Sequence, residues 1–213
     1  MPRCVIIGGA AIHNYEVIRT YLGPDDFIVC CDSGLKHRSG LGVEADLIIA
    51  DFDSAENPHL PVETIVLPHE KDDTDSMAAV REMTARGFDE YLLLGVFGNR
   101  LDHTLGNIYI LLWLANRGKK ALAVDDYSEM EIIKPGVVGI IDCVYPYFSL
   151  VSIAGAAEEV TIKNAKYTMD NAVIDPEYQY AVSNEPVPGK TAEVSLKKGA
   201  LLLIRDRGEI SDT

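Results

Sequence analysis

Acidic residues follow the apolar runs of this chain, at places where several strands would end. In chain order these residues are Asp32, Asp51, Asp53, Asp72, Asp73, Asp75 and Asp102. If the runs are parallel strands, the acids gather at the carboxyl edge of the sheet, where open parallel sheets bind their ligands. Crowded carboxylates repel one another unless a cation neutralises them, and hard oxygen ligands suit Mg²⁺. The pattern predicts a magnesium-dependent site for a phosphorylated ligand.

The segment 51–54 (DFDS) closes a very apolar run. In an extended backbone Asp51 and Asp53 point to the same side, while Phe52 points back into the core. Two carboxylates placed in this way are able to hold one or two metal ions. A solvated acidic turn is the alternative, and these residues alone leave both possibilities open.

The segment 71–75 (KDDTD) opens a predicted helix. Thr74 or Asp73 is a suitable N-cap, and acidic residues favour a helix N-terminus. A functional interpretation places Asp75 at the metal and Lys71 near phosphate oxygens. The two interpretations are compatible.

The segment 95–103 (GVFGNRLDH) predicts a glycine-containing loop between a strand and a helix. Glycine lets the backbone approach a phosphate closely, and Arg100 is able to bind a phosphate with two donors. Asp102 and His103 begin the helix, whose first N–H groups favour anions. A surface or capping role is the alternative for His103, but its neighbours favour a functional one.

Several common phosphate and hydrolase motifs are missing. The sequence has no GxxxxGK[ST] loop, no GxSxG and no HExxH, and residues 8–10 (GGA) do not complete GxGxxG. With these motifs absent, the remaining hypothesis is a nucleotide site built from a metal ion and an arginine, without a P-loop.

The first part of the chain alternates strand and helix patterns. Strands are predicted at 2–9, 27–31, 46–50, 63–68, 91–96 and 120–125, and helices at 12–23, 35–41, 74–87 and 101–118. Gly23 and Gly87 are the expected helix ends. This order predicts a Rossmann-like, mostly parallel sheet covered by helices.

The pattern changes near residues 125–128, and no later segment has a helical period. Short strands are predicted at 136–142, 147–153, 157–163, 180–184, 192–198 and 199–205. They predict a C-terminal antiparallel β-sandwich or barrel. We therefore expect an α/β domain at 1–127 and an all-β domain at 128–213.

Composition limits the partners and the compartment. The chain has 213 residues, 47% of them hydrophobic, and a formal net charge of −14. Such an acidic chain repels nucleic acid and anionic membranes, but it is able to bind one nucleotide if metal ions offset the charge. The start does not resemble a signal peptide, and the four cysteines are expected in strands, buried and reduced. These features predict a cytoplasmic protein.

Five of these segments together resemble the thiamine pyrophosphokinase (thiamine diphosphokinase) family. The matching segments are 31–34 (CDSG), 51–54 (DFDS), 71–75 (KDDTD), 98–103 (GNRLDH) with Asn107, and 182–185 (VSNE) followed by 199–202 (GALL). They occur in the family's order and span nearly the whole chain. Ser33, Ala50 and Asn99 stand where the family often has glycine, which affects fine geometry.

The resemblance implies a role for each matched residue. Asp51, Asp53 and Asp75 would bind Mg²⁺, with Asp32 nearby, and Asp75 is also a guess for the general base. Phosphate and nucleotide contacts would come from Lys71, Asp72, Thr74, Arg100, Asp102, His103 and Asn107. Ser183 and Asn184 would bind thiamine from the β domain. The family works as a homodimer with sites between subunits.

The reaction that the resemblance implies begins when the thiamine hydroxyl attacks the β-phosphorus of ATP, giving thiamine diphosphate and AMP. One alternative is another magnesium-dependent phosphotransferase or phosphatase on the same scaffold. A second is a non-catalytic nucleotide or thiamine sensor. Some family members stack a tryptophan on the substrate, but Trp113 is expected in the helical core, which leaves Tyr178 and Tyr180 as candidates.

Overall fold

The computed structural model describes residues 2–52, 59–68, 72–98, 100–178 and 180–208. Within them the chain divides into two compact units, Met1–Asp126 and Tyr127–Thr213. Each unit has its own elements and its own core.

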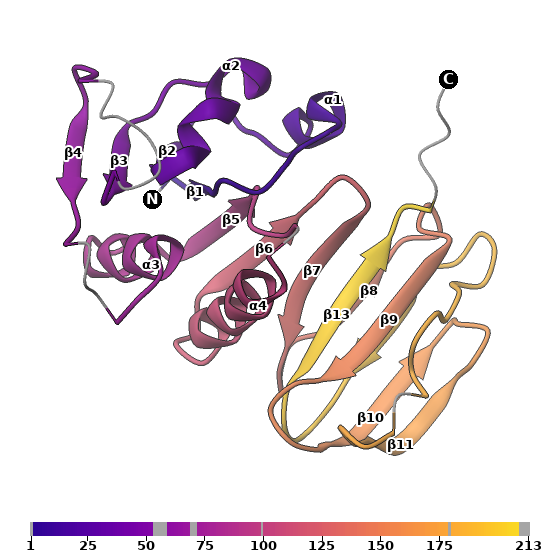
Figure 1. Ribbon diagram of the computed structural model, residues 1–213. Helices are drawn as coiled ribbons and strands as arrows, with labels where there is room; N and C mark the ends of the chain where they lie inside the picture. Colours follow the sequence, from indigo (N-terminus) through magenta and orange to yellow (C-terminus); the bar gives the residue numbers. More distant parts are fainter. Residues whose placement is uncertain (1, 53–58, 69–71, 99, 179, 209–213) are drawn as a thin grey trace. The chain divides into compact units, whose positions relative to one another are not determined.

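The first unit contains a parallel sheet (Figure 1). Its strands are β1 (Cys4–Ile7), β2 (Phe27–Cys31), β3 (Leu47–Ala50), β4 (Glu63–Val66), β5 (Glu90–Leu94) and β6 (Lys120–Val124). They lie in the order β4-β3-β2-β1-β5-β6, and every pair is parallel. The chain starts in the middle of this order and reverses direction across the sheet between β1 and β5. The expected parallel, helix-flanked sheet is confirmed.

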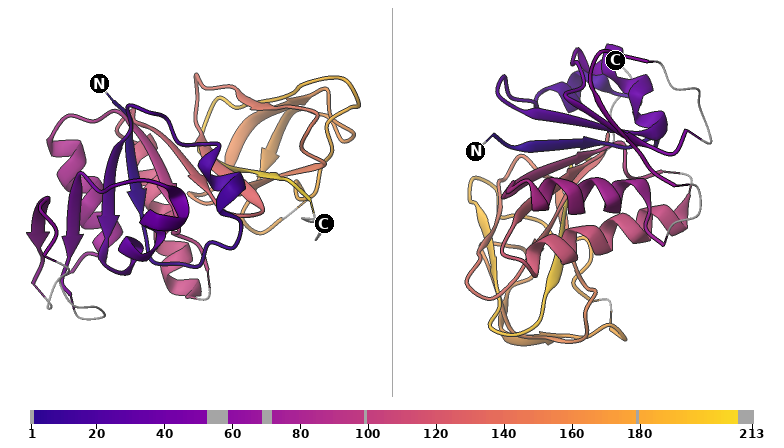
Figure 2. Two further views of the ribbon diagram at one scale, coloured as in Figure 1. Left: turned by 90° about the horizontal axis from the view of Figure 1, so that it is seen from above. Right: turned by 90° about the vertical axis from the view of Figure 1, so that its left-hand side faces the viewer.

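Helices cover both faces of this sheet. They are α1 (Tyr15–Arg19), the 3₁₀ helix η1 (Asp32–His37), α2 (Arg38–Leu41), α3 (Asp75–Ala85) and α4 (Leu101–Ala115). Figure 2 shows α3 and α4 on one face and α1, η1 and α2 on the other. Alternate strand residues face opposite layers, so β1 is buried along its whole length. This two-sided burial explains why the strands are continuous apolar runs in the sequence.

Local signals set the start of two helices. The side chain of Asn14 accepts a hydrogen bond from the Val17 amide at 3.1 Å and caps α1. Thr74 caps α3 in the same way, since its hydroxyl accepts from the Met77 amide at 3.3 Å. Gly87 follows α3 with a φ of 95°, as expected for a glycine that ends a helix.

The second unit is built from antiparallel strands. One sheet contains β7 (Ser128–Ile133), β13 (Leu201–Asp206) and β9 (Tyr147–Ser152); another contains β11 (Met169–Ile174), β10 (Ala157–Lys163), β12 (Ala192–Ser195) and β8 (Gly139–Ile141). Phe148 and Leu203 from the first sheet share one buried core with Val160 and Val194 from the second. The predicted antiparallel sandwich is thereby confirmed.

Some sequence predictions of elements are wrong. Helix α1 ends at Arg19 and not at Gly23, and residues 180–184 form no strand, although Asn184 makes an isolated bridge to Phe148. The strands β7 and β11 were not predicted, and Cys143 lies exposed in a turn.

The glutamates of β7 explain why its sequence did not predict a strand. Glu129 is buried, yet it accepts a hydrogen bond from the Tyr145 hydroxyl and lies 3.7 Å from Arg205. Glu131 of the same strand pairs with Arg205. Such partners make a buried carboxylate tolerable. They are distant in the sequence, Tyr145 in the segment before β9 and Arg205 in β13, so the sequence of β7 shows no local apolar pattern.

The described part of the chain contains no helix that is long and apolar enough to cross a membrane.

Candidate active site

A pocket of about 640 Å³ lies in the first unit, at the carboxyl ends of β1, β2, β3 and β5. Its lining residues are Gly8, Gly9, Ala10, Ala11, Cys31, Asp32, Ser33, Lys36, Asp51, Thr74, Asp75, Ser76, Gly95, Val96, Gly98, Arg100, His103 and Asn107. The strand order reverses between β1 and β5, and ligands of open parallel sheets bind at such a reversal. The volume is in the range of small-molecule sites.

Residues 8–11, called the β1 loop below, lie against β5 and the segment that follows it. The Gly8 amide donates to the Leu94 carbonyl and the Ala10 amide to the Gly95 carbonyl, both at 2.8 Å. A Cβ on Gly8 would lie 2.6 Å from the Gly95 oxygen, so only glycine fits there. The two backbones therefore approach closely enough to form one wall of the pocket.

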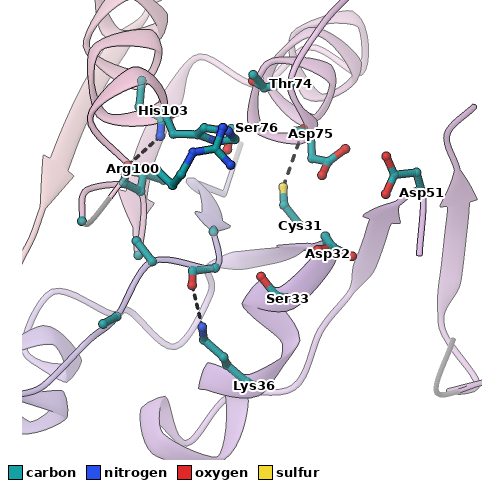
Figure 3. A pocket seen from close by; sticks show the side chains of 18 residues that line it. Cys31, Asp32, Ser33, Lys36, Asp51, Thr74, Asp75, Ser76, Arg100 and His103 are labelled. Carbon is teal, nitrogen blue, oxygen red and sulfur yellow. Dashed lines mark hydrogen bonds between the residues drawn. The ribbon is translucent and has the colours of Figure 1, made fainter. Parts of the chain in front are cut away.

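Three aspartates line the pocket from different elements. Asp32 follows β2, Asp51 follows β3 and Asp75 begins α3. Figure 3 shows the carboxylates of Asp51 and Asp75 pointing toward each other. Asp51 is only 8% exposed. The strand order thus brings together side chains that are far apart in the sequence.

The backbone at two strand ends is strained. Asp32 has a φ of 41° and Phe52 a φ of 55°, which non-glycine residues rarely adopt. Such strain gathers at functional sites. Phe52 packs against the core of the unit, as predicted, but its left-handed backbone departs from the extended geometry expected for 51–53. Asp53 itself lies outside the described residues.

Arg100 is the exposed cation of the loop before α4. It forms a two-pronged ion pair with Asp102, with Nε–Oδ1 at 3.0 Å and Nη2–Oδ2 at 2.6 Å. The Arg100 guanidinium holds the pKa of Asp102 well below its usual range. Asp102 does not line the pocket, and its carboxylate pairs with the Arg100 guanidinium, which does.

Asn107 supports the same loop from inside. Its side chain is 6% exposed, and its Nδ2 donates to the Val96 carbonyl at 2.6 Å. The Thr104 hydroxyl also accepts from the Gly98 amide at 3.3 Å. Helix α4 therefore fixes the backbone that carries Arg100.

The start of α3 joins structural and site roles. Thr74 lines the pocket while its hydroxyl caps the helix. Asp73, the other predicted N-cap, does not cap the helix; its carboxylate pairs with Arg81 at 3.0 Å. The Cys31 thiol donates to the Asp75 carbonyl at 3.8 Å, and burial raises the pKa of Cys31 well above its ordinary value, which keeps the thiol neutral.

The site residues predicted in the first unit fall into three groups. Those that line the pocket are Asp32, Asp51, Thr74, Asp75, Arg100, His103 and Asn107. Asp72 and Asp102 are described but do not line it, and Asp53 and Lys71 lie outside the described residues. Among the described residues, no group of three or more His, Cys, Asp or Glu side chains is close enough to hold a metal ion.

Sequence reasoning missed the β1 loop, Ser33, Lys36 and Ser76 as pocket residues. The run of small residues directly after the first strand was a usable signal for the loop. Lys36 had no such signal, because it lies on η1 and reaches the pocket only through the fold; its Nζ donates to the Gly9 carbonyl at 2.6 Å.

In the second unit the predicted thiamine residues have different surroundings. Asn184 is 3% exposed, and its side chain accepts from the Tyr167 amide at 3.0 Å and donates to the Tyr167 carbonyl at 2.8 Å. Ser183 has a φ of 59°, and its amide donates to Ser149 Oγ at 3.0 Å. Asn184 thus fixes the backbone of Tyr167, whose side chain is exposed.

The aromatic candidates also differ from expectation. Trp113 is half-buried, and the Arg117 guanidinium lies 3.6 Å from its ring centre, so it is not a core residue. The Tyr180 hydroxyl donates to the Val173 carbonyl, which holds this side chain against β11. Tyr178 is exposed.

The first unit has a parallel sheet with an acid-and-arginine pocket at its strand reversal, and the second is a β-sandwich, which defines a class of two-domain α/β proteins with a candidate ligand site on the α/β unit. Family models narrow this class. One described as "Thiamin pyrophosphokinase, catalytic domain" matches residues 18–123, and one described as "Thiamin pyrophosphokinase, vitamin B1 binding domain" matches residues 136–201. The chain belongs to the thiamin pyrophosphokinase family.

Individual relatives agree with this assignment. The thiamine pyrophosphokinase of Bacillus subtilis (strain 168) is 29% identical over 137 residues, which span 64% of each chain. The crystal structure of thiamin pyrophosphokinase from Geobacillus thermodenitrificans matches with a TM-score of 0.83 and 26% identity, and 99% of each chain is covered. The Bacillus subtilis crystal structure, at 23% identity, shares the fold with a TM-score of 0.83 over 97% of this chain and 100% of its own.

Proposed function

We propose that this protein is an ATP-dependent thiamine diphosphokinase, which transfers the pyrophosphoryl group of ATP to the hydroxyl of thiamine and releases AMP. One observation supports this most strongly. The pocket that unites Asp51, Asp75 and Arg100 lies in the unit that the catalytic-domain model matches. Pyrophosphoryl transfer depends mainly on positioning and on neutralising phosphate charge, and these side chains suit both tasks.

The chemistry of the pocket's acids supports a magnesium assignment, although no three such side chains within the described residues are close enough to hold the ion by themselves. Carboxylate oxygens of Asp32, Asp51 and Asp75 come from three elements, and Mg²⁺ prefers such ligands together with substrate phosphates. We assign the metal to Asp51 and Asp75, with Asp53 as the further ligand and Asp32 nearby. When bound, Mg²⁺ would offset the negative charge of the phosphates.

The protein's own cations and backbone would hold the rest of ATP. The planar fork of Arg100 is suited to two phosphate oxygens, and Asp102 keeps it oriented. His103 and Thr74 lie at the pocket wall, at the N-terminal ends of α4 and α3, where helix N–H groups favour anions. Lys71 and Asp72 precede α3 in the sequence and are assigned to the same nucleotide contacts.

Thiamine would bind at the second unit, which the vitamin B1 model matches. Tyr167 is the better candidate for covering the thiamine ring than Tyr178 or Tyr180, because Asn184 fixes its backbone while the residue itself is 60% exposed. Ser183 directly precedes Asn184 in the chain. We expect a homodimer in which these residues complete the active site of the partner subunit.

The charge of the chain supports a small-molecule enzyme. A net charge of −14 disfavours nucleic acid and anionic membranes as partners, and we expect the enzyme in the cytoplasm.

Incubation with ATP, Mg²⁺ and thiamine tests the proposal directly. We expect AMP and thiamine diphosphate in equal amounts by chromatography. Asp51→Asn and Asp75→Asn should each lower turnover about 100-fold or more, since a metal contributes several kcal/mol and each 1.36 kcal/mol is tenfold in rate. Asp170→Asn, at an exposed position on β11, is the matched control and should retain full activity.

The same assay separates the alternatives. ADP as product would indicate transfer of one phosphoryl group, and phosphate release without thiamine would indicate a phosphatase. Tight thiamine binding in calorimetry without any ATP-dependent product would indicate a sensor. Any of these results would contradict the proposed reaction.

A further inference from the structure

His37 is a buried histidine that the proposed reaction does not use. It lies at the end of η1 and is 2% exposed. Its Nε2 is 2.8 Å from the carbonyl oxygen of Ala10, and its Nδ1 is 2.7 Å from the Tyr15 hydroxyl. Ala10 belongs to the β1 loop and lines the pocket. His37 therefore touches the pocket wall from behind, through one backbone carbonyl.

The partners of His37 determine where its protons lie. A carbonyl oxygen only accepts, so Nε2 must carry a hydrogen and donate it in the bond to the Ala10 carbonyl. A neutral ring then offers Nδ1 as acceptor to the Tyr15 hydroxyl. Burial lowers the pKa of His37 below its ordinary value of 6.5, and Lys36 lowers it further, while the Ala10 carbonyl and Asp126 oppose them. The neutral ring satisfies every contact described here.

The β1 loop is held on two sides. On one side β5 and the residue after it accept from the amides of Gly8 and Ala10. On the other, Lys36 and His37 donate to the consecutive carbonyls of Gly9 and Ala10. Lys36 is exposed, whereas His37 is buried and its ring cannot move without disturbing its neighbours.

The next segment of the chain is held as well. The buried Asp126 carboxylate accepts from the amides of His13 and Asn14 at 3.0 and 2.8 Å. The chain is therefore fixed on both sides of the two carbonyls that Lys36 and His37 bind, so the β1 loop has little freedom to move.

We propose that His37 is a positioning residue which, as a neutral imidazole bridging Tyr15 and Ala10, holds the β1 loop in the conformation that binds the nucleotide. The identity of that ligand rests on the proposed function. As pH falls through the pKa of His37, Nδ1 gains a hydrogen and no longer accepts from Tyr15, and a buried charge appears beside Lys36. Nucleotide affinity is then lost on the acid side.

Calorimetry with α,β-methylene ATP and Mg²⁺ between pH 5 and pH 8 tests this inference without requiring turnover. The wild-type affinity should fall at acid pH. The midpoint of this loss should equal the midpoint that NMR measures for the His37 ring, and this match distinguishes an effect of His37 from one of His103. His37→Gln keeps an amide donor near Ala10 but does not titrate, so this acid loss should disappear. His37→Ala should weaken binding about 10-fold at every pH, because the Ala10 carbonyl loses its donor from His37.

Tyr15→Phe provides a second test if the alanine variant does not fold. It removes the donor that favours the neutral ring, so the midpoint should move to higher pH in both measurements. An unshifted midpoint, an acid loss that persists in His37→Gln, or an absence of nucleotide binding by the wild-type protein would overturn the inference. Failure to make thiamine diphosphate, with these binding results intact, would overturn the proposed function alone.

Discussion

Two polar side chains of the pocket differ in what they hold. Arg100 is exposed and pairs with Asp102, which is also exposed, so its removal disturbs little packing. Asn107 is buried and supplies a donor to the Val96 carbonyl. We therefore expect Arg100 to act on the ligand and Asn107 to act on the loop.

The two kinds of residue predict different variants. Arg100→Ala should raise the KM for ATP about 10-fold, because a charged hydrogen bond to phosphate is lost, without a change in melting temperature. Asn107→Ala should lower the free energy of unfolding by about 1–3 kcal/mol, because a buried carbonyl loses its partner, and should reduce activity as well. Steady-state kinetics and thermal unfolding measure both effects. An unstable Arg100→Ala protein would contradict this division.

At the scale of elements, the position of η1 depends on a close approach to β1. A Cβ added to Gly34 would lie 2.1 Å from the Ile7 carbonyl oxygen and 2.8 Å from its carbon. Backbone atoms cannot rotate away as a side chain does. The glycine therefore lets η1 bring Asp32 and His37 to the end of the sheet.

Gly34→Ala should destabilise the protein by about 2 kcal/mol or more, because overpacking forces the two backbones apart. Gly106→Ala in α4 is the matched control, since a Cβ there meets nothing within 4 Å. That exchange should stabilise by about 0.5–1 kcal/mol, the usual gain for alanine within a helix. Denaturant unfolding compares the two, and equal stabilities would show that the η1 contact is not tight.

At the scale of the whole molecule, the two units carry different parts of the proposed reaction. The acid-and-arginine pocket lies in the unit Met1–Asp126, whereas Tyr167, Ser183 and Asn184 lie in the other. Each unit has its own hydrophobic core. A homodimer in which one subunit completes the site of the other would join these parts.

Mixing two inactive variants tests this arrangement. Asp51→Asn disables the pocket, and Tyr167→Ala removes the proposed ring contact. If sites form between subunits, random exchange should restore about a quarter of wild-type activity, because half of the dimers are mixed and one of their two sites is intact. Sedimentation should show the dimer. No recovery after verified subunit exchange would place each site within one chain.

The sequence by itself determined the alternation of strands and helices, the antiparallel second unit and the placement of acids at strand ends. These features depend on local properties: apolar runs, caps such as Thr74 and breaks such as Gly87. Tertiary structure alone decided that Lys36 and His37 reach the β1 loop. It also decided that Asn107 supports Val96, and that Glu129 is buried in a strand. Each of these depends on a partner distant in the chain, so no local pattern records it.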